Sequence, residues 1–235
     1  MNVQCGNCFK LITDNRVIQY FIDIIESKDP YTQGHSHHVK VITGALIDRL
    51  PGYLQAVIDT PKLLTAALLH DIGKITVPDS ILNKESGLSD DEWKIMKEHP
   101  ERGKRILSNS VLRESGDWIL YHHERIDGKG YFGIPGDEIP LESKIIAIAD
   151  TFSALRTYRI YRPAKSIEET IRIMREGWGT QLDPMLTDYF LSYDTDFLEH
   201  LECDCDICRQ RREEWEKKMG QIPPAHVPGR ICPPV

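Results

Sequence analysis

The chain has 235 residues, of which 40% are hydrophobic and 28% charged, and its formal net charge at pH 7 is −7. This length supports one large domain or two small ones with a real core, and the composition excludes a wholly disordered or collagen-like chain. The acidic balance argues against general nucleic-acid binding, and the longest apolar stretches are far shorter than the ~18 residues that span a bilayer.

The N-terminus lacks the basic segment followed by an apolar segment that a secretory signal requires. The six cysteines are therefore expected in a reducing compartment, as thiols or metal ligands rather than disulfides. We predict a cytoplasmic protein without a membrane segment.

Helical signals follow one another from residue 14 to residue 176. Apolar residues recur at helical spacing after Asp14 and Asn15, either of which could cap a first helix. A second helix is expected from about Thr32 to Leu50, and Pro61 suits the first turn of a third.

Two capping boxes mark helices farther along the chain, Ser89 with Glu92 and Ser166 with Glu169. The segments WILYHHE and LESKIIAIADTFSAL are expected to form buried helices, with the Gly- and Pro-rich loop DGKGYFGIPGDEIP between them. No useful strand pattern of alternating hydrophobicity is present, so the sequence predicts an all-α fold.

The composition changes near residue 200. We predict one main domain over residues 1–200 and a C-terminal appendage over residues 201–235. The appendage begins as the charged, cysteine-bearing segment ECDCDICRQRREEWEKKMG. Its Pro-rich end, QIPPAHVPGRICPPV, cannot form a regular helix.

Polar side chains lie at the ends of several apolar segments. His70 and Asp71 end one, His122 and His123 end another, and Asp150 follows IIAIA. Each of them alone is more typical of a satisfied core residue, but buried carboxylates need a cation or hydrogen-bond donors. Together these groups should converge, and imidazole with carboxylate suits Zn, Mn or Fe. The residues alone leave both a metal site and a polar cluster open.

A longer set of motifs resembles a known family. HDIGK at 70–74, preceded by GHSHHV at 34–39, is similar to the HD superfamily of metal-dependent phosphohydrolases. The continuation VPDSILNK, MKEHPERG, HHERIDGKGY, IPLESKIIAIADTFSAL and RIYRPA resembles the HD-GYP subfamily, over about residues 30 to 175. This resemblance implies a helical bundle with a two- or three-metal site and hydrolysis of cyclic di-GMP.

The resemblance also implies seven metal ligands. The family pattern places four of them on one metal: His35, His70, Asp71 and Asp150. It places four on the other, with the first as a bridge: Asp71, His99, His122 and His123. Some members hold a third metal with a Glu four residues before the first His, where this chain has Tyr31. Two divalent transition metals, such as Fe or Mn, are therefore expected, and His37 and His38 are expected on the surface.

The charge of such a site suits a phosphodiester. Two divalent ions outweigh Asp71, Asp150 and a bridging hydroxide, so the site stays positive. Each ion lowers the pKa of bound water toward ~7, which makes a metal-bridged hydroxide available to attack phosphorus. Lys74 is predicted to hold a phosphate oxygen together with a metal. Asp71 and Lys74 are the expected catalytic residues.

The expected substrate side lies farther along the chain. By resemblance, Arg159 and Arg162 contact phosphate or guanine, although solvated charges are an alternative, and Tyr131 stacks on a base. Phe132 stands where the family has proline, in a loop one residue shorter than the family pattern. The loop is therefore expected to be freer, so that substrate binding carries an ordering cost. The loop at 127–140 could also dock a protein partner.

The cysteines form two short-spaced clusters near the two termini. They are Cys5 and Cys8, then Cys203, Cys205 and Cys208. Four thiolates could bind Zn or hold an Fe–S cluster if the termini meet, and unligated thiols are the alternative.

Three functions remain for this site. The leading one is a metal-dependent phosphodiesterase acting on a cyclic dinucleotide of the cyclic di-GMP type. The second is an HD-type hydrolase of another nucleotide phosphoester. The third is a non-catalytic module that senses a nucleotide or docks a partner, against which the presence of all seven ligands and Lys74 counts.

Overall fold

The computed structural model describes residues 15–29, 34–84, 86–110, 112–157, 164–201 and 217, and these residues form helices without any strand. The all-α prediction is confirmed. The α-helices are α2 Asn15–Lys28, α3 His35–Arg49, α4 Gly52–Gln55, α5 Thr60–Leu69, α6 Asp79–Leu82, α7 Asp90–Met96, α8 His99–Leu107, α9 Gly116–Leu120, α10 Leu141–Arg156, α11 Ile167–Glu176, α12 Pro184–Phe190 and α13 Thr195–Glu199. Two 3₁₀ helices are η2 Ile72–Thr76 and η3 Arg113–Ser115.

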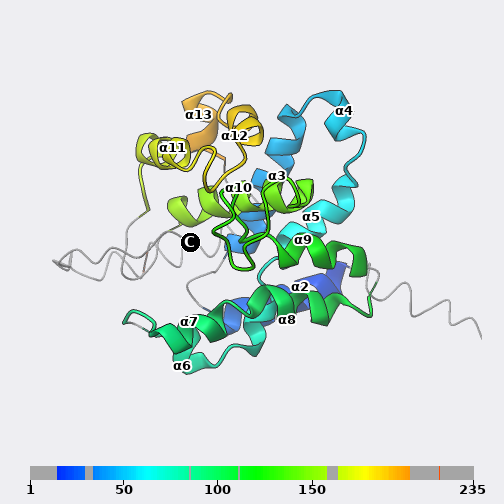
Figure 1. The fold of residues 1–235 in the computed structure, drawn as a ribbon, viewed down its shortest axis with the longest axis vertical. Helices are drawn as coiled ribbons and strands as arrows, with labels where there is room; N and C mark the ends of the chain where they lie inside the picture. Colours follow the sequence, from blue (N-terminus) through cyan, green and yellow to red (C-terminus); the bar gives the residue numbers. More distant parts are fainter. Residues whose placement is uncertain are drawn as a thin grey trace, which may run out of the picture.

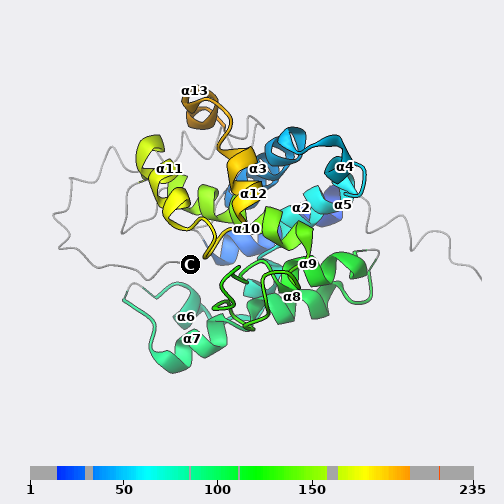
Figure 2. The ribbon, with the colours of Figure 1, turned by 45° about the horizontal axis from the view of Figure 1, so that its top comes forward.

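Helices α3 and α10 lie side by side at the centre of the fold (Figures 1 and 2). Both views show α11, α12 and α13 on one side of α10, and α6, α7 and α8 on the other. The core around α10 is apolar and closed to solvent, with Phe152 of α10 against Phe190 of α12 at a ring distance of 5.1 Å. The central pair thus provides the support on which both layers pack.

Local sequence signals set several helix ends. Ser89 and Glu92 form the predicted capping box at the start of α7. Ser166 caps α11 by accepting a hydrogen bond from the amide of Glu169. The Glu169 carboxylate lies 2.6 Å from Nζ of Lys165, so it pairs with that lysine.

Two features differ from the sequence expectations. The segment WILYHHE is helical only up to Leu120, so His122 and His123 follow the end of α9. Two helices beyond residue 176, α12 and α13, were missed, although Asp183 and Asp194 cap them with their side chains. Both helices are short, which weakens their periodic signal.

Several predictions concern residues outside the described ranges. The cysteine clusters lie there: Cys5, Cys8, Cys203, Cys205 and Cys208. Their metal binding stays a prediction, as does the domain division at residue 200. Within the described part of the chain, each helix is too short or too polar to cross a membrane.

A close backbone approach joins η2 to α8. A Cβ atom at Gly73 would stand 1.8 Å from the carbonyl oxygen of His99 and 2.7 Å from the amide nitrogen of Gly103. Only glycine permits this contact, because real side chains cannot approach backbone atoms so closely. The glycine of the HDIGK motif therefore brings Asp71 and Lys74 beside the start of α8.

We expect Gly73→Ala to lower the thermal unfolding midpoint strongly, because η2 would have to move away from α8. The matched control is Gly44→Ala in α3, whose Cβ would meet only Leu64 Cδ2, at 3.7 Å. The control should be neutral or slightly stabilising, since alanine favours a helix interior by roughly 0.5–1 kcal/mol over glycine. Circular dichroism melts of both variants measure this, and equal midpoints would contradict the close approach.

Candidate metal centre

The seven predicted ligands converge from helix ends and from the middle of α10. Each of the first six lies at or beside the end of a helix, where its side chain can turn into a common space. In chain order they are His35 at the start of α3, His70 after α5, Asp71 before η2, His99 at the start of α8, His122 and His123 after α9, and Asp150 in α10.

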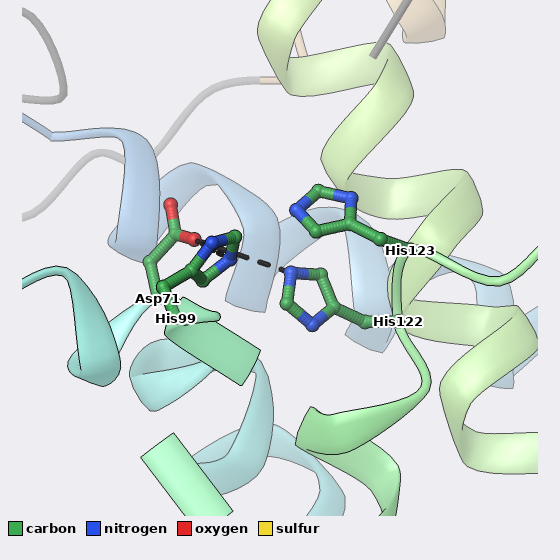
Figure 3. A group of neighbouring side chains, drawn as sticks. All are labelled: Asp71, His99, His122 and His123. Carbon is green, nitrogen blue, oxygen red and sulfur yellow. Dashed lines mark ion pairs between the residues drawn. The ribbon is translucent and has the colours of Figure 1, made fainter. Parts of the chain in front are cut away.

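The ligand atoms form three overlapping groups, and within each group all of them lie within 4.8 Å of one another. The largest group appears in Figure 3 and combines Asp71, His99, His122 and His123. The others are His35 with His70 and Asp71, and His70 with His122 and Asp150. Asp71, His70 and His122 each belong to two groups, and Asp71 is the one among them to which the family resemblance gives the place of a bridging ligand.

Three of the histidines are held in the same way by their own backbone. In each, Nδ1 lies within hydrogen-bond distance of the carbonyl oxygen three residues earlier. The pairs are His70 with Ala67 at 2.8 Å, His99 with Met96 at 2.8 Å and His122 with Ile119 at 2.5 Å. Because a carbonyl only accepts, Nδ1 carries the proton and Nε2 presents a lone pair. This arrangement is typical of histidines that bind metals through Nε2.

The lone pairs are buried and face a carboxylate. The Nε2 atoms of all three histidines and Oδ1 of Asp71 have no hydrogen-bond partner among the described residues. Nε2 of His99 lies 3.2 Å from Asp71 Oδ1, and Nε2 of His70 lies 3.3 Å from Asp71 Oδ2. Buried acceptors that face one another destabilise a fold unless a cation lies between them. The donor set therefore fits a metal ion.

Burial keeps the imidazoles of His35, His122 and His123 neutral. It lowers the pKa of His122 to about 3 and lowers the pKa of His123 well below its usual range. It also lowers the pKa of His35, despite the nearby Asp150 carboxylate. Since metals bind neutral imidazole, these three side chains are in the required state at neutral pH.

The two carboxylates respond to their neighbours. Burial alone would raise the pKa of Asp71, but the charges of Lys74 and His70 outweigh it and hold that pKa well below its usual range. Burial would also raise the pKa of Asp150. The neighbouring histidines, His35 above all, outweigh that effect and lower the pKa. Burial would lower the pKa of His70, whereas the Asp71 charge outweighs it and raises that pKa. Both carboxylates are thus ionised, as metal binding requires.

Lys74 and Tyr131 lie beside the predicted ligands. Nζ of Lys74 is 2.6 Å from Asp71 Oδ2, and only 19% of its side chain is exposed, so it is not a solvated surface lysine. The Tyr131 ring lies 4.6 Å from the His123 ring, at an angle of 35°, and 6.3 Å from the His99 ring. Arg159, Arg162 and Tyr31 lie outside the described residues.

The loop that carries Tyr131 is held by Glu124, a residue that the sequence analysis missed. The Glu124 side chain is buried and accepts hydrogen bonds from the amides of Phe132 at 2.7 Å and Ile134 at 3.0 Å. A Cβ at Gly130 would stand 2.5 Å from Glu124 Cα, so glycine is needed for this packing. The sequence signal for this role was the position of Glu124. This acidic residue directly follows the predicted ligands His122 and His123 and comes shortly before the Gly-rich loop.

Two sequence expectations are corrected by these contacts. The loop was expected to be freer because Phe132 replaces proline, but the Phe132 amide, which proline would lack, binds Glu124. His37 and His38 were expected on the surface, yet both are half-buried. Nε2 of His38 lies 2.7 Å from the Leu201 carbonyl oxygen, which ties α3 to the end of α13.

A small polar cavity adjoins the ligands. Its volume is about 20 Å³, and its lining includes His123, Asp150, Thr151 and Gln181. This is room for about one water molecule, and the polar lining supplies the partners that a buried water needs. The cavity can therefore hold a water molecule beside Asp150 and His123.

Comparison with known proteins places this site in a family context. Residues 19–186 match the family described as HD domain. A "Probable cyclic di-GMP phosphodiesterase" of Vibrio cholerae is 36% identical over 200 residues, which cover 78% of this chain and 45% of that protein. A "3'3'-cGAMP-specific phosphodiesterase 3" of the same organism is 39% identical over 172 residues, which cover 72% of this chain and 36% of that protein.

The comparisons confirm the predicted family resemblance. The chain spans less than half the length of the two curated relatives above. The solved structure of an HDG"Y"P protein from Bdellovibrio bacteriovorus superposes with a TM-score of 0.50 at 20% identity, covering 67% of this chain and 51% of that chain. This likeness concerns the fold, and it agrees with the helical arrangement described above.

We expect His99→Ala and His122→Ala to lower the metal content of the purified protein, because each removes a buried Nε2 that faces Asp71. His200→Ala is the matched control, since that histidine is exposed at the end of α13 and contacts Asp196 of its own helix. Elemental analysis of anaerobically purified protein measures the effect. Full metal content in both site variants would contradict the ligand assignment.

Proposed function

The chain belongs to the HD domain family, and we propose that it is a metal-dependent phosphodiesterase that hydrolyses a cyclic dinucleotide. The observation that carries the proposal is the shared position of Asp71. One ionised carboxylate lies between two groups of imidazoles whose ligand atoms are buried. Such a donor set suits two cations, and two cations suit a phosphodiester.

We propose two divalent transition metals, Fe or Mn, at this centre. One would be held by His35, His70, Asp71 and Asp150. The other would be held by Asp71, His99, His122 and His123. When bound, such ions lower the pKa of water and stabilise negative charge on a phosphate.

Lys74 is proposed to bind a non-bridging phosphate oxygen. The Asp71 charge raises the pKa of Lys74, although burial opposes it, so the ammonium stays charged at neutral pH. Its stem is fixed by the 2.6 Å contact with Asp71, which leaves its other two N–H donors for a ligand. A preorganised donor of this kind acts most strongly on charge that develops in the transition state.

Tyr131 is proposed to contact the nucleotide. Burial raises the pKa of Tyr131 to about 12, so its hydroxyl stays protonated and can donate a hydrogen bond. The ring lies over His123 and is fixed there by the Glu124-bound loop. Arg159 and Arg162 remain proposed contacts for phosphate or guanine, and the 127–140 loop remains a proposed partner surface.

The choice among cyclic dinucleotides stays open between two classes. The relatives include proteins named for cyclic di-GMP and proteins named for 3'3'-cGAMP. Both ligands carry two phosphodiesters, and each has at least one guanine. Turnover of a panel of cyclic dinucleotides and simple phosphodiesters, with Mn(II) or Fe(II) added, tests the proposal. Hydrolysis of a cyclic dinucleotide is expected, and turnover of only other phosphoesters would contradict it.

We expect Lys74→Met to retain the metals but to lower kcat/KM by about 10²-fold or more, the scale for removal of one transition-state donor. The control is Lys62→Met. Lys62 lies away from the metal centre, and its Nζ pairs with a carboxylate oxygen of Glu114 at 2.8 Å. Steady-state kinetics with parallel elemental analysis separate the two effects. Unchanged kcat/KM in the Lys74 variant, at full metal content, would exclude its catalytic role.

We expect Phe132→Pro to raise KM for the cyclic dinucleotide, the reverse of what the sequence alone suggests. The substitution removes the amide that donates to Glu124, and a hydrogen bond to a charged group contributes about 1.5–3 kcal/mol. Without this hydrogen bond the loop would be less ordered in the free protein. Part of the free energy of substrate binding would then be used to order it, which weakens binding. Phe132→Leu is the control, because it removes the ring but keeps the amide. A lower KM for the proline variant would contradict the role of Glu124.

A further inference from the structure

A chain of hydrogen bonds runs from the metal centre to the end of α13. His35 Nδ1 lies 2.8 Å from Ser153 Oγ, and the same oxygen lies 3.0 Å from Nδ1 of His38. Nε2 of His38 lies 2.7 Å from the carbonyl oxygen of Leu201. Ser153 is closed to solvent and His35 is 5% exposed, so the hydrogen bond between these two side chains is buried.

The sequence pattern explains how these groups meet. His38 follows His35 by three residues on α3, and Ser153 follows Asp150 by three residues on α10. Residues three apart on a helix share a face. Because α3 and α10 lie side by side (Figure 1), His35 faces Asp150. One helical turn farther along, His38 faces Ser153.

The Leu201 carbonyl sets the direction of donation along this series of hydrogen bonds. The Leu201 carbonyl oxygen has no proton, so His38 must donate to it through Nε2. A neutral imidazole has one N–H, so His38 Nδ1 then accepts the hydroxyl proton of Ser153. The Ser153 oxygen in turn accepts from Nδ1 of His35. This order leaves a lone pair on His35 Nε2, which lies 3.0 Å from Asp150 Oδ1.

The far end of the chain is itself fixed. Arg156 of α10 binds the Glu199 carboxylate at 2.8 Å and the Lys165 carbonyl at 2.8 Å. Leu201 packs its side chain into the hydrophobic core. The carbonyl that His38 binds is therefore held from two sides.

We infer that Ser153 and His38 are positioning residues that fix His35 as an Nε2 ligand, with the Leu201 carbonyl as their anchor. His70, His99 and His122 are fixed by carbonyls of their own segments, whereas His35 depends on a chain that crosses from α3 through α10 to the C-terminal end of α13. The inference rests on the proposed role of His35 as a metal ligand. It makes the segment after α13 a structural partner of the metal centre.

The test is isothermal titration calorimetry, which measures the affinity of the chelator-treated full chain for Mn²⁺. Ser153→Ala should weaken Mn²⁺ binding by about 10–100-fold, the usual effect of removing the partner of a ligating histidine. Ser143→Ala is the matched control. Ser143 lies on the same helix, is equally closed to solvent and donates to the Trp118 carbonyl at 2.9 Å. Its variant should lose similar thermal stability in the metal-free state but keep wild-type Mn²⁺ affinity.

Variants of the second positioning residue make the test independent of one substitution. His38→Leu should weaken Mn²⁺ binding like Ser153→Ala. His38→Gln should recover much of the affinity, because an amide offers a donor for Leu201 and an acceptor for Ser153.

Two outcomes would overturn the inference, and they are distinguishable. Wild-type Mn²⁺ affinity in Ser153→Ala and His38→Leu, together with weakened binding in His35→Ala, would leave His35 a ligand and remove the positioning role. Wild-type affinity in His35→Ala itself would overturn the proposed ligand set, and the inference with it.

Discussion

The structure depends on a cluster of buried acceptor atoms that needs a cation. The Nε2 atoms of three histidines and one oxygen of Asp71 lie buried and close together, without hydrogen-bond donors among the described residues. In a protein interior such an arrangement strongly destabilises the fold, because each lone pair has lost its water and gained no proton. Metal ions would satisfy all of these atoms together. The polar interior of this helical fold is therefore best understood as a ligand set rather than as a hydrogen-bonded core.

The helices are arranged so that these atoms turn inward. Backbone carbonyls orient three of the imidazoles from within their own segments, which requires only a helix end at the right place. Gly73 then allows η2 to touch α8, and this contact brings Asp71 between histidines from different parts of the chain. His35 differs from these three, since its orientation depends on the packing of α3 against α10. The geometry of the proposed metal centre and the stability of the fold are thus linked most directly at that pair of helices.

The family motifs in the sequence indicated seven ligands, and the structure brings the side chains of all seven into three overlapping groups. The sequence could not predict the groups that act through tertiary contacts. Glu124 looked like an ordinary acid in a polar motif, and its role appears only when the loop folds back and presents the amides of Phe132 and Ile134. His38 and Ser153 are 115 residues apart, and no local pattern reveals that they meet. Short helices such as α12 were missed because few residues carry their period.

The most direct measurement of the central claim is the number of Mn²⁺ ions bound by Asp71→Asn, titrated calorimetrically in the full chain. Asparagine keeps the size of the side chain but removes the charge and one of the two acceptor oxygens. Because Asp71 lies in two of the three groups of ligand atoms and is proposed to join both metals, the account predicts that the wild type binds two ions and that this variant loses affinity at both sites. A variant that keeps one site at wild-type affinity would show that Asp71 does not join two metals.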